Sequence, residues 1–369
     1  MGALRSTLKL AAAASLALVP LAAAPAAGEE VAFAGKTVRM IVGSTAGGVT
    51  DVGARLVARF IGKYLPQSPT VVVQNMPAAN GIAAANYFYQ QVPPDGLTFL
   101  AGSSSQVTPD VIRTNPAVRY DPTKFAYIGG IENAGTLLIA AKPAIARLAA
   151  RSDQPVVMGQ VGGARTAGLI AVWGAEYLGW KLRWVTGYQG TPQLAFALQR
   201  GEADMMDTAS YNVIEPLLAR GGFAAVLQTG VFSNGQLTRR DGFGDVPLLT
   251  QMLEGKIAGA MREAFASWLR TVEIGKYYAL PPNTPADYLA AYRSAFGRMQ
   301  DDPEFKQLAK SAIDPDYVMM SALDTKHLID DLVGTPEEAL ELVNRLRHKY
   351  GLPSGEAGDG SSPRKLGPQ

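Results

Sequence analysis

The sequence predicts an α/β fold with two units, because short apolar strands alternate with helical segments along most of its 369 residues. The pattern is clearest in residues 37–65, where residues 38–42 form the nearly continuous apolar run of a strand covered on both faces. After a glycine turn, apolar residues from Val52 to Leu65 recur at the three-and-four spacing of an amphipathic helix. The same alternation begins again after residue 120, so we expect a second α/β unit.

The turn between this strand and this helix is predicted to bind an anion. It consists of Ser44, Thr45, Ala46, Gly47 and Gly48. The two glycines can expose backbone amides at the helix start, where the helix dipole attracts negative charge. Thr50 or Asp51 is placed to cap the helix. The alternative is that the glycines serve only the geometry of the turn.

Two known nucleotide-binding loops do not fit this turn. A P-loop needs a lysine at the helix start, whereas Gly48 is followed by Val49 and Thr50. A dinucleotide fingerprint needs a glycine where Thr45 stands and an acidic residue at the end of the second strand, which ends at Gln74. The sequence therefore excludes both motifs.

Two further loops are expected at the same edge of the first sheet. Strand Thr70–Gln74 runs into a turn that ends with Ala78, Ala79, Asn80 and Gly81, and a helix follows over Ile82–Gln91. Strand Leu97–Ala101 runs into Gly102 and three serines, of which Ser103 and Ser104 come first. Because ligands of open α/β sheets bind at the carboxyl ends of the strands, we expect the three loops to form one site.

The second unit has glycine and hydroxyl loops of its own. Its strands are expected over Pro155–Gly159, Leu182–Val185 and Ala203–Asp207, and Thr191-Pro192 begins a helix. The loop after the first of these strands contains Gly163, Arg165 and Thr166. Arg165 either pairs with a ligand carboxylate or is a solvated loop residue. Tyr188 either lines the pocket or packs, and for Tyr211 we expect packing.

The last third is expected to return to the first unit. Strand Ala224–Thr229 is interpreted as the return crossing, and three helices begin at Thr284-Pro285, Asp302-Pro303 and Thr335-Pro336. Glu338 would close a capping box on Thr335. These helices are expected to cover the first sheet. The predicted domains are therefore residues 29–104 plus 229–353, and residues 105–228.

The two ends of the chain are predicted to lie outside these domains. Arg5 and Lys9 precede an apolar run over residues 10–24, the layout of a secretory signal peptide, which we place at residues 1–27. A membrane anchor or a core helix is the alternative, but the run is rich in alanine and broken by prolines. Residues 354–369 are rich in Gly, Ser, Pro and charge, and are expected to form a disordered tail.

The composition excludes several functions. Charged residues make up 18% and the formal net charge is +2, so no basic field recruits nucleic acid. The chain has no cysteine, which excludes disulfides, a lipid anchor on cysteine and thiol catalysis. His327 and His348 are the only histidines, and both are expected on helices far from the loops. Since nucleophile elbows and metal-ligand spacings are also missing, we expect no enzyme activity, no metal and no cofactor.

An ordered set of motifs makes the chain resemble the extracytoplasmic solute receptors of tripartite tricarboxylate transporters, the Bug family. The resemblance covers about residues 35–350. Its motifs are a Gly-Gly-x-Thr-Asp loop within Ile41–Asp51, a Val-Val-x-Asn-x-Pro loop within Val72–Gly81, a Pro-Asp-Gly-x-Thr turn at Pro94–Thr98, a tyrosine and a Gly-x-x-Asp-Met-Met strand within Tyr188–Asp207, and Asp-Val-Pro at Asp245–Pro247.

The resemblance implies the α/β fold of a two-domain periplasmic binding protein (a Venus flytrap), with a ligand cleft between the domains and two crossing strands. It also implies that the amides of Ser44–Gly48 and Ala78–Gly81 hold a carboxylate, with hydroxyls from Ser103 and Ser104. From the second domain, Gly163, Arg165, Thr166 and Asp207 would face them. Two loops depart from the family pattern: Ala78 and Asn80 stand where relatives commonly have glycine, and residues 44–46 replace a proline-glycine run.

The expected function is therefore the periplasmic capture of a small organic dicarboxylate or tricarboxylate. The resemblance implies delivery to the membrane permease subunits of a tripartite transporter, and we expect a monomer. One alternative is a sensor subunit that reports the ligand to a signalling partner. The other is a secreted enzyme on the same scaffold, which would need a base or nucleophile that the sequence does not reveal.

Overall fold

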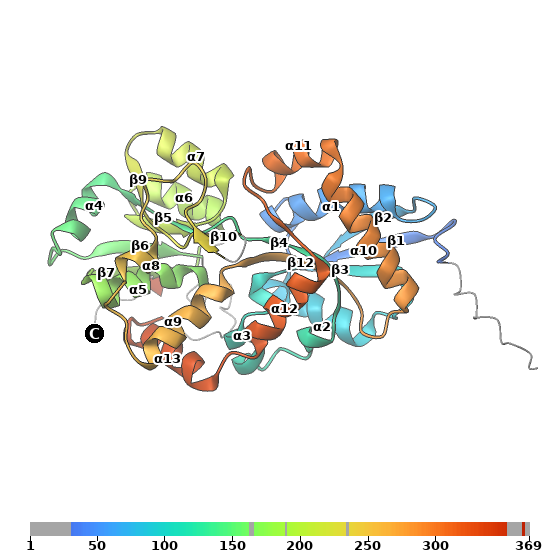
Figure 1. Ribbon diagram of the computed structural model, residues 1–369. Helices are drawn as coiled ribbons and strands as arrows, with labels where there is room; N and C mark the ends of the chain where they lie inside the picture. Colours follow the sequence, from blue (N-terminus) through green and yellow to red (C-terminus); the bar gives the residue numbers. More distant parts are fainter. Residues whose placement is uncertain (1–30, 162–165, 189, 234–235, 353–363, 366–369) are drawn as a thin grey trace, which may run out of the picture. The chain divides into compact units, whose positions relative to one another are not determined.

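The computed structural model describes residues 31–161, 166–188, 190–233, 236–352 and 364–365. In this part of the chain, helices accompany two six-stranded sheets and a small hairpin (Figure 1). The predicted signal peptide at residues 1–27 lies outside the described residues. So does the predicted tail, except for two residues that form strand β14.

The first sheet has the strand order β13-β4-β12-β3-β1-β2. Its strands are β1 (Thr37–Val42), β2 (Thr70–Asn75), β3 (Thr98–Ser103), β4 (Ala126–Glu132), β12 (Ile274–Leu280) and β13 (Met319–Met320). Strand β1 pairs in parallel with β2 and β3, so the carboxyl ends of these three strands lie at one edge. Strand β12 lies antiparallel between β3 and β4.

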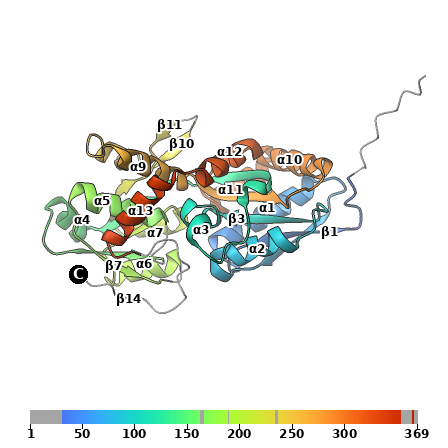
Figure 2. The ribbon, with the colours of Figure 1, turned by 90° about the horizontal axis from the view of Figure 1, so that it is seen from below.

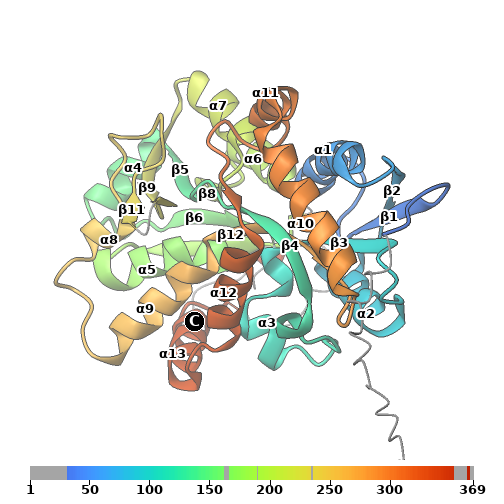
Figure 3. The same ribbon diagram turned by 45° about the vertical axis from the view of Figure 1, so that its right-hand side comes forward.

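Helices cover both faces of the first sheet. They are α1 (Val49–Tyr64), α2 (Ile82–Gln91), α3 (Pro109–Thr114), α10 (Ala286–Asp301), α11 (Pro303–Ala312) and α12 (Ala322–Val333). Because side chains alternate along a strand, Val38, Met40 and Val42 pack with α1, α10 and α11, whereas Ile41 packs with α2 and α12. Figure 3 shows α10 and α12 beside this sheet.

The second sheet has the order β14-β7-β6-β8-β5-β9. Its strands are β5 (Leu137–Ala141), β6 (Val156–Gln160), β7 (Leu182–Thr186), β8 (Met205–Thr208), β9 (Phe223–Gln228) and β14 (Arg364–Lys365). A separate hairpin is formed by β10 (Val231–Ser233) and β11 (Gln236–Thr238). Strand β6 pairs in parallel with β7 and β8, so a second set of carboxyl ends shares one edge.

The helices that accompany the second sheet include three from late in the sequence. They are α4 (Lys142–Ala149), α5 (Leu169–Leu178), α6 (Thr191–Gln199), α7 (Tyr211–Ala219), α8 (Leu249–Met252), α9 (Ala260–Thr271) and α13 (Glu337–Lys349). Helices α6 and α7 share one core cluster, and α5, α8, α9 and α13 share another. Figure 2 shows α9 and α13 side by side.

Sheet membership corrects two expectations about where segments lie. Strand β4 was expected in the second unit, but its hydrogen bonds to β12 and β13 place it in the first sheet. Residues 224–229 were interpreted as the return crossing, but β9 pairs with β5 in the second sheet. The chain instead returns to the first sheet between α9 and β12. Of the three late helices, α10 and α11 pack on the first sheet as expected, whereas α13 packs on α9.

The helix starts also differ from the sequence pattern. Asp302 caps α11 as expected, since its side chain accepts hydrogen bonds from the amides of Glu304 and Phe305. The capping box on Thr335 is wrong, because α13 begins one residue later and its cap makes no side-chain hydrogen bond. Helix α1 begins at Val49 with Gly48 as its cap, so neither Thr50 nor Asp51 caps it.

Two buried ion pairs join segments that pack with different sheets. Arg347 on α13 lies 2.6 Å from Asp110 on α3, and the exposed fractions of the two side chains are 1% and 5%. Arg240, which follows β11 and is fully buried, lies 2.7 Å from Asp314, which follows α11. Each buried charge is thus compensated by a carboxylate, as burial requires.

Candidate functional site

The loops after β1 and β2 touch each other, as the parallel pairing predicts. The Asn75 side chain donates a hydrogen bond to the carbonyl of Ser44 at 2.9 Å, and the Met76 amide donates to the carbonyl of Val42 at 2.8 Å. A Cβ atom on Gly43 would lie 3.0 Å from the Cα atom of Gly81. The residues predicted at Ser44–Gly48 and Ala78–Gly81 therefore belong to neighbouring loops.

Asp51 fixes the first loop, although the sequence suggested only a helix cap for it. Its carboxylate is almost completely buried and accepts hydrogen bonds from the Gly47 amide at 2.8 Å, Arg55 Nε at 2.9 Å and Asn75 Nδ2 at 2.8 Å. Burial raises the pKa of Asp51, but the hydrogen bonds from Arg55, Asn75 and Gly47 outweigh it and hold the pKa below its ordinary value. Asp51 is therefore a carboxylate that joins α1, the first loop and the end of β2.

The backbone amides of the first loop divide into two groups. The amide of Gly47 donates to Asp51, and the amide of Gly48 donates to the carbonyl of Thr45 at 3.2 Å. Among the described residues, the amides of Ser44, Thr45 and Ala46 have no hydrogen-bond acceptor. These three amides are thus the donors that the first loop offers to an anion.

The second loop has a left-handed backbone over three consecutive residues. Ala79 has φ 51° and ψ 48°, Asn80 has φ 52° and ψ 34°, and Gly81 has φ 85°. Left-handed backbone is strained at Ala79, because its Cβ atom approaches the carbonyl oxygen. The backbone then changes from left-handed at Gly81 to right-handed at Ile82, and such a change of hand points successive amides into one concavity, a geometry that binds anions. The replacement of glycine by Ala78 and Asn80 thus leaves the amides in place.

The third loop adds serine hydroxyls beside the second. Ser103 ends β3, and its Oγ lies 2.9 Å from Oγ of Ser105, which in turn donates to the carbonyl of Asn80 at 3.3 Å. The predicted residue Ser104 begins a short 3-10 helix that ends at Gln106. Gln106 is fully buried beneath the three loops and was not predicted from the sequence.

Of the predicted residues in the second unit, some lie outside the described part of the chain. Gly163 and Arg165 lie outside it, and Thr166 begins a 3-10 helix before α5. Asp207 lies in β8, where it pairs with Leu138 and is fully buried. Tyr188 is 7% exposed and packs in the core cluster of α6 and α7, and burial, then the negative Glu202, raise its pKa.

Gln160 is a polar residue of the second unit that the sequence did not single out. It ends β6, is 1% exposed, and among the described residues neither atom of its carboxamide has a hydrogen-bond partner. Its Nε2 atom would lie 2.0 Å from a Cβ atom on Gly168, so Gln160 lies against the start of α5. Its place at the carboxyl end of a parallel strand is the sequence signal that could have found it.

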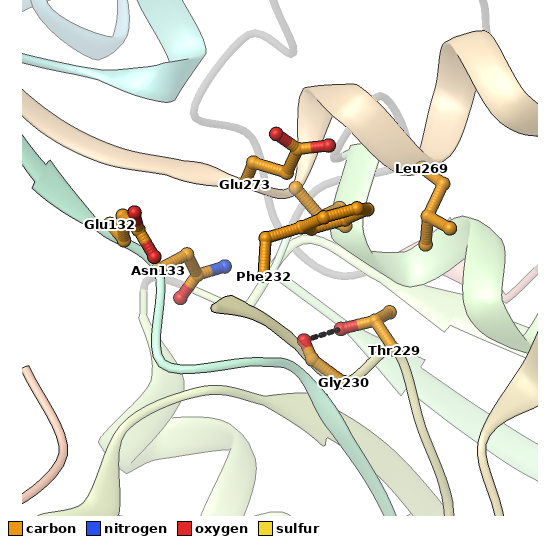
Figure 4. A pocket seen from close by; sticks show the side chains of 8 residues that line it. Glu132, Asn133, Thr229, Gly230, Phe232, Leu269 and Glu273 are labelled. Carbon is orange, nitrogen blue, oxygen red and sulfur yellow. Dashed lines mark hydrogen bonds between the residues drawn. The ribbon is translucent and has the colours of Figure 1, made fainter. Parts of the chain in front are cut away.

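A small pocket lies elsewhere, where the chain leaves β4 and enters β12. Glu132, Asn133, Phe232 and Glu273 are among the residues that line it (Figure 4). Burial and the negative Asp324 raise the pKa of Glu132 to about 7. Burial, together with Glu132 and Asp331, raises the pKa of Glu273 to about 7, although Arg270 acts against it. None of the predicted site residues lines this pocket.

The three loops offer backbone amides and serine hydroxyls that can hold an anion. In the part of the chain that the structure describes, no group of three or more His, Cys, Asp or Glu residues could hold a metal ion. In the same part, none of the helices has the length and apolarity to cross a membrane. The candidate site is therefore formed by the amides and hydroxyls of the three loops.

The chain is similar in sequence to two UPF0065 proteins. The chain is 26% identical to a UPF0065 protein of Bordetella pertussis over 312 residues, which are 81% of this chain and 88% of that protein. It is 36% identical to a UPF0065 protein of Cupriavidus necator over 114 residues, which are 30% of this chain and only 32% of that protein.

Solved structures with the same fold include a periplasmic binding protein and two proteins with bound dicarboxylates. The periplasmic binding protein BugD has 20% identity and a TM-score of 0.61, over 84% of this chain and 97% of its own. MatC from Rhodopseudomonas palustris with bound malate has 20% identity and a TM-score of 0.59, over 82% of this chain and 98% of its own. Rpa4515 of R. palustris with adipate has 18% identity and a TM-score of 0.63, over 85% of this chain and 97% of its own.

These likenesses confirm the predicted two-domain α/β fold of a periplasmic binding protein. The model of the tripartite tricarboxylate transporter family receptor matches residues 53–344. The chain belongs to the receptor family of tripartite tricarboxylate transporters.

Proposed function

We propose that this protein captures a small organic dicarboxylate or tricarboxylate in the periplasm and delivers it to the membrane permease subunits of a tripartite transporter. The observation that carries the proposal is the approach of the first two loops at Gly43 and Gly81, which brings the amides of two helix starts to one place. Malate in MatC and adipate in Rpa4515 support a dicarboxylate as the ligand.

The first unit holds one carboxylate of the ligand in this proposal. Thr45, Ala46 and the left-handed residues of the second loop donate backbone hydrogen bonds, and the serines of the third loop add hydroxyls. The second unit recognises the other end of the ligand through the loop after β6, which contains Gly163, Arg165 and Thr166, and through Asp207. Closure of the two domains follows because these contacts form only in the closed state.

Export and assembly complete the proposal. Residues 1–27 act as a cleavable signal peptide, and the mature protein is a monomer that docks on its permease.

The domain division that we propose follows the two sheets: residues 31–132 plus 274–333 form one domain, and residues 137–271 plus α13 form the other. Binding leaves the ligand unchanged in this proposal, with the first unit offering it backbone amides and serine hydroxyls.

Titration of the mature protein with monocarboxylates, dicarboxylates and tricarboxylates tests the function. Malate and adipate are included, and binding is followed by thermal shift and calorimetry. Ligand recovered after binding is analysed by NMR, and an unchanged spectrum is expected. Flat responses to every carboxylate, with none copurifying, would contradict the proposal.

A glycine variant connects binding with the loops. In Gly43→Val, the new side chain would meet Gln106 Nε2, 2.4 Å from its Cβ atom, and would separate the first two loops. We expect this variant to lose carboxylate binding. The control is Gly297→Ala on α10, where a Cβ atom meets nothing within 4 Å and binding should be retained.

A further inference from the structure

Gln106 occupies the point where the three loops of the candidate site meet. It ends the 3-10 helix that follows β3, and its side chain is completely buried. A buried carboxamide needs partners for two donor hydrogens and for its acceptor oxygen. The partners that the structure gives it come from separate parts of the chain.

Each polar atom of the Gln106 carboxamide bonds to a different segment. Oε1 accepts hydrogen bonds from the Ser103 amide at 3.1 Å and from the Tyr277 hydroxyl at 3.0 Å. Nε2 donates to the carbonyl of Asn80 at 3.5 Å. One side chain thus connects the second loop, the third loop and strand β12.

Gly43, at the start of the first loop, lies against the same carboxamide. A Cβ atom would lie 2.4 Å from Gln106 Nε2 if it were added to Gly43, and 1.8 Å from it if it were added to Gly81. Both distances are shorter than the closest approach of two non-bonded atoms. The carboxamide therefore fills the space that these two glycines leave. The glycines of the two loops are therefore fitted to Gln106 as well as to the turns.

Tyrosine side chains also fix the position of Gln106. The Tyr120 hydroxyl donates to the Gln106 carbonyl at 2.8 Å, and Tyr277 packs edge-on against Tyr127. Burial, with smaller contributions from Tyr120 and Tyr127, raises the pKa of Tyr277 well above its ordinary value, so its hydroxyl stays protonated as a donor. The oxygen of Gln106 is thereby directed toward Tyr277 and its nitrogen toward Asn80.

We propose that Gln106 is the positioning residue of the anion site: its neutral carboxamide sets the distance between the three loops and places no negative charge beneath their amides. The inference rests on the proposed function for the identity of the ligand, but not for the geometry of the loops. A glutamate at this position would keep the length of the side chain. It would lose the donor to Asn80 and add a charge that repels a bound carboxylate.

The test compares Gln106→Glu and Gln106→Met with matched variants at Gln228. Gln228 is equally buried in β9, where Nε2 donates to the carbonyls of Phe243 at 2.9 Å and Val246 at 2.8 Å, and Oε1 accepts from the Arg240 amide at 2.7 Å. Gln228→Glu and Gln228→Met therefore remove the same kind of hydrogen bonds away from the three loops. Tyr277→Phe is a milder variant, because it removes only the hydroxyl that donates to Gln106.

The first measurement needs no ligand. Hydrogen exchange of residues 43–48 and 78–82 is compared among all variants and the unchanged protein. We expect faster exchange of these loops in both Gln106 variants and, to a smaller extent, in Tyr277→Phe, but not in the Gln228 variants. Unchanged exchange in the Gln106 variants and in Tyr277→Phe would overturn the proposal. If the Gln106 variants do not fold, the Tyr277→Phe result decides alone.

The second measurement uses adipate as the probe, at pH 7.5 and at pH 5.0, with each affinity divided by that of the unchanged protein at the same pH. We expect Gln106→Met to bind about tenfold more weakly at both values, because the hydrogen bonds of the buried carboxamide to Ser103, Tyr277 and Asn80 are lost. Gln106→Glu should bind more weakly still at pH 7.5. It should recover toward the methionine variant at pH 5.0, because burial raises the pKa of a carboxyl and so favours its protonated form.

The two measurements separate this inference from the proposed function. Faster loop exchange together with no adipate binding by the unchanged protein would support the positioning role and count against adipate as the ligand. If the unchanged protein binds adipate and Gln106→Glu binds it equally tightly at both pH values, the inference is overturned. The proposed function then still stands.

Discussion

The amide nitrogen of Gly47 lies 2.8 Å from Oδ2 of Asp51, so the first loop is tied to the helix that follows it. The same carboxylate reaches Arg55 on the next turn of α1 and Asn75 at the end of β2. Asp51 thus holds two loops of the candidate site through one buried group. Among the described residues, this arrangement leaves the amides of Ser44, Thr45 and Ala46 for a ligand.

Replacing Asp51 by asparagine tests this role. The amide nitrogen of the new side chain cannot accept the hydrogen bonds of Gly47 and Arg55. We expect the free energy of unfolding to fall by about 1–3 kcal/mol, the cost of buried partners left unsatisfied. Urea denaturation measures the change, and calorimetry should show weaker adipate binding. The control is Asp287→Asn, an exposed acidic residue in the first turn of α10, for which less than about 1 kcal/mol is expected. Equal losses in both variants would contradict the role of Asp51.

The lowered pKa of Asp51 also predicts how the free energy of unfolding depends on pH. Because the pKa is lower in the folded state, the unfolded state binds more protons in acid, and the stabilisation by Asp51 is present above the ordinary carboxyl pKa. It is lost as the pH falls through the folded value. The difference in stability between the unchanged protein and Asp51→Asn should therefore shrink in acid, and a constant difference would argue against this shift.

We expect the substitution of Ala79 by glycine to be tolerated better than the same substitution at an alanine inside a helix. Its φ of 51° is left-handed, where glycine has no steric penalty, so Ala79→Gly should be neutral or stabilise the fold by up to about 1 kcal/mol. Ala290→Gly on α10 is the matched substitution, and it should destabilise by about 1 kcal/mol because glycine weakens a helix interior. Thermal and urea unfolding of both variants give the comparison. A loss at Ala79 as large as the loss at Ala290 would show that the strained backbone is absent.

The ion pair between Arg347 and Asp110 is expected to matter for stability because it is buried. Arg347→Met leaves the Asp110 carboxylate without its arginine, and a loss of about 3–5 kcal/mol is expected. Arg345→Met on the same helix breaks an exposed pair with Glu341 and should cost less than about 0.5 kcal/mol. Tryptophan fluorescence in urea measures both. Adding Asp110→Asn to Arg347→Met should recover part of the loss, and no recovery would mean that the buried charge is not its cause.

The pocket that Glu132 and Glu273 line predicts a fall in stability as the pH rises. The pKa of Glu273 is raised to about 7, so the folded state binds more protons than the unfolded state between the ordinary glutamate pKa and pH 7. Stability is then lost as the pH rises through this window. Glu273→Gln should be more stable than the unchanged protein at pH 8 and should approach it in acid. Glu263→Gln, exposed in the first turn of α9, is the control and should show no such trend. A pH-independent difference for Glu273→Gln would refute the assignment.

Local patterns in the sequence predicted most of the elements around the site. The apolar run before Gly43 and the spacing from Val52 to Leu65 predicted β1 and α1, and the helix expected at Ile82–Gln91 has the bounds of α2. The family and the two-domain fold were also predicted, and both are confirmed. The contact between the first two loops followed from parallel pairing alone.

What the sequence did not reveal depends on contacts between distant segments. Strand β12 lies in the first sheet between β3 and β4, and no local sequence pattern predicts this position. Asp51 looked like a helix cap, because a single sequence does not show that its partners are Gly47 and Asn75. Gln106 is a polar residue in a serine-rich turn, and its burial results from Tyr277, which lies 171 residues later. The predicted residues Gly163 and Arg165 lie outside the described residues and stay predictions.

The place of β12 has a consequence for how the chain folds. This strand supplies the hydrogen bonds that join β3 to β4, and it is synthesised only after all the strands β5–β9 of the other sheet. The first sheet therefore cannot close until residue 280 is available, whereas β5–β9 can pair with one another earlier. Closing a sheet over so long a stretch of chain is slow, so the loops that meet over Gln106 should be among the last parts of the molecule to become ordered.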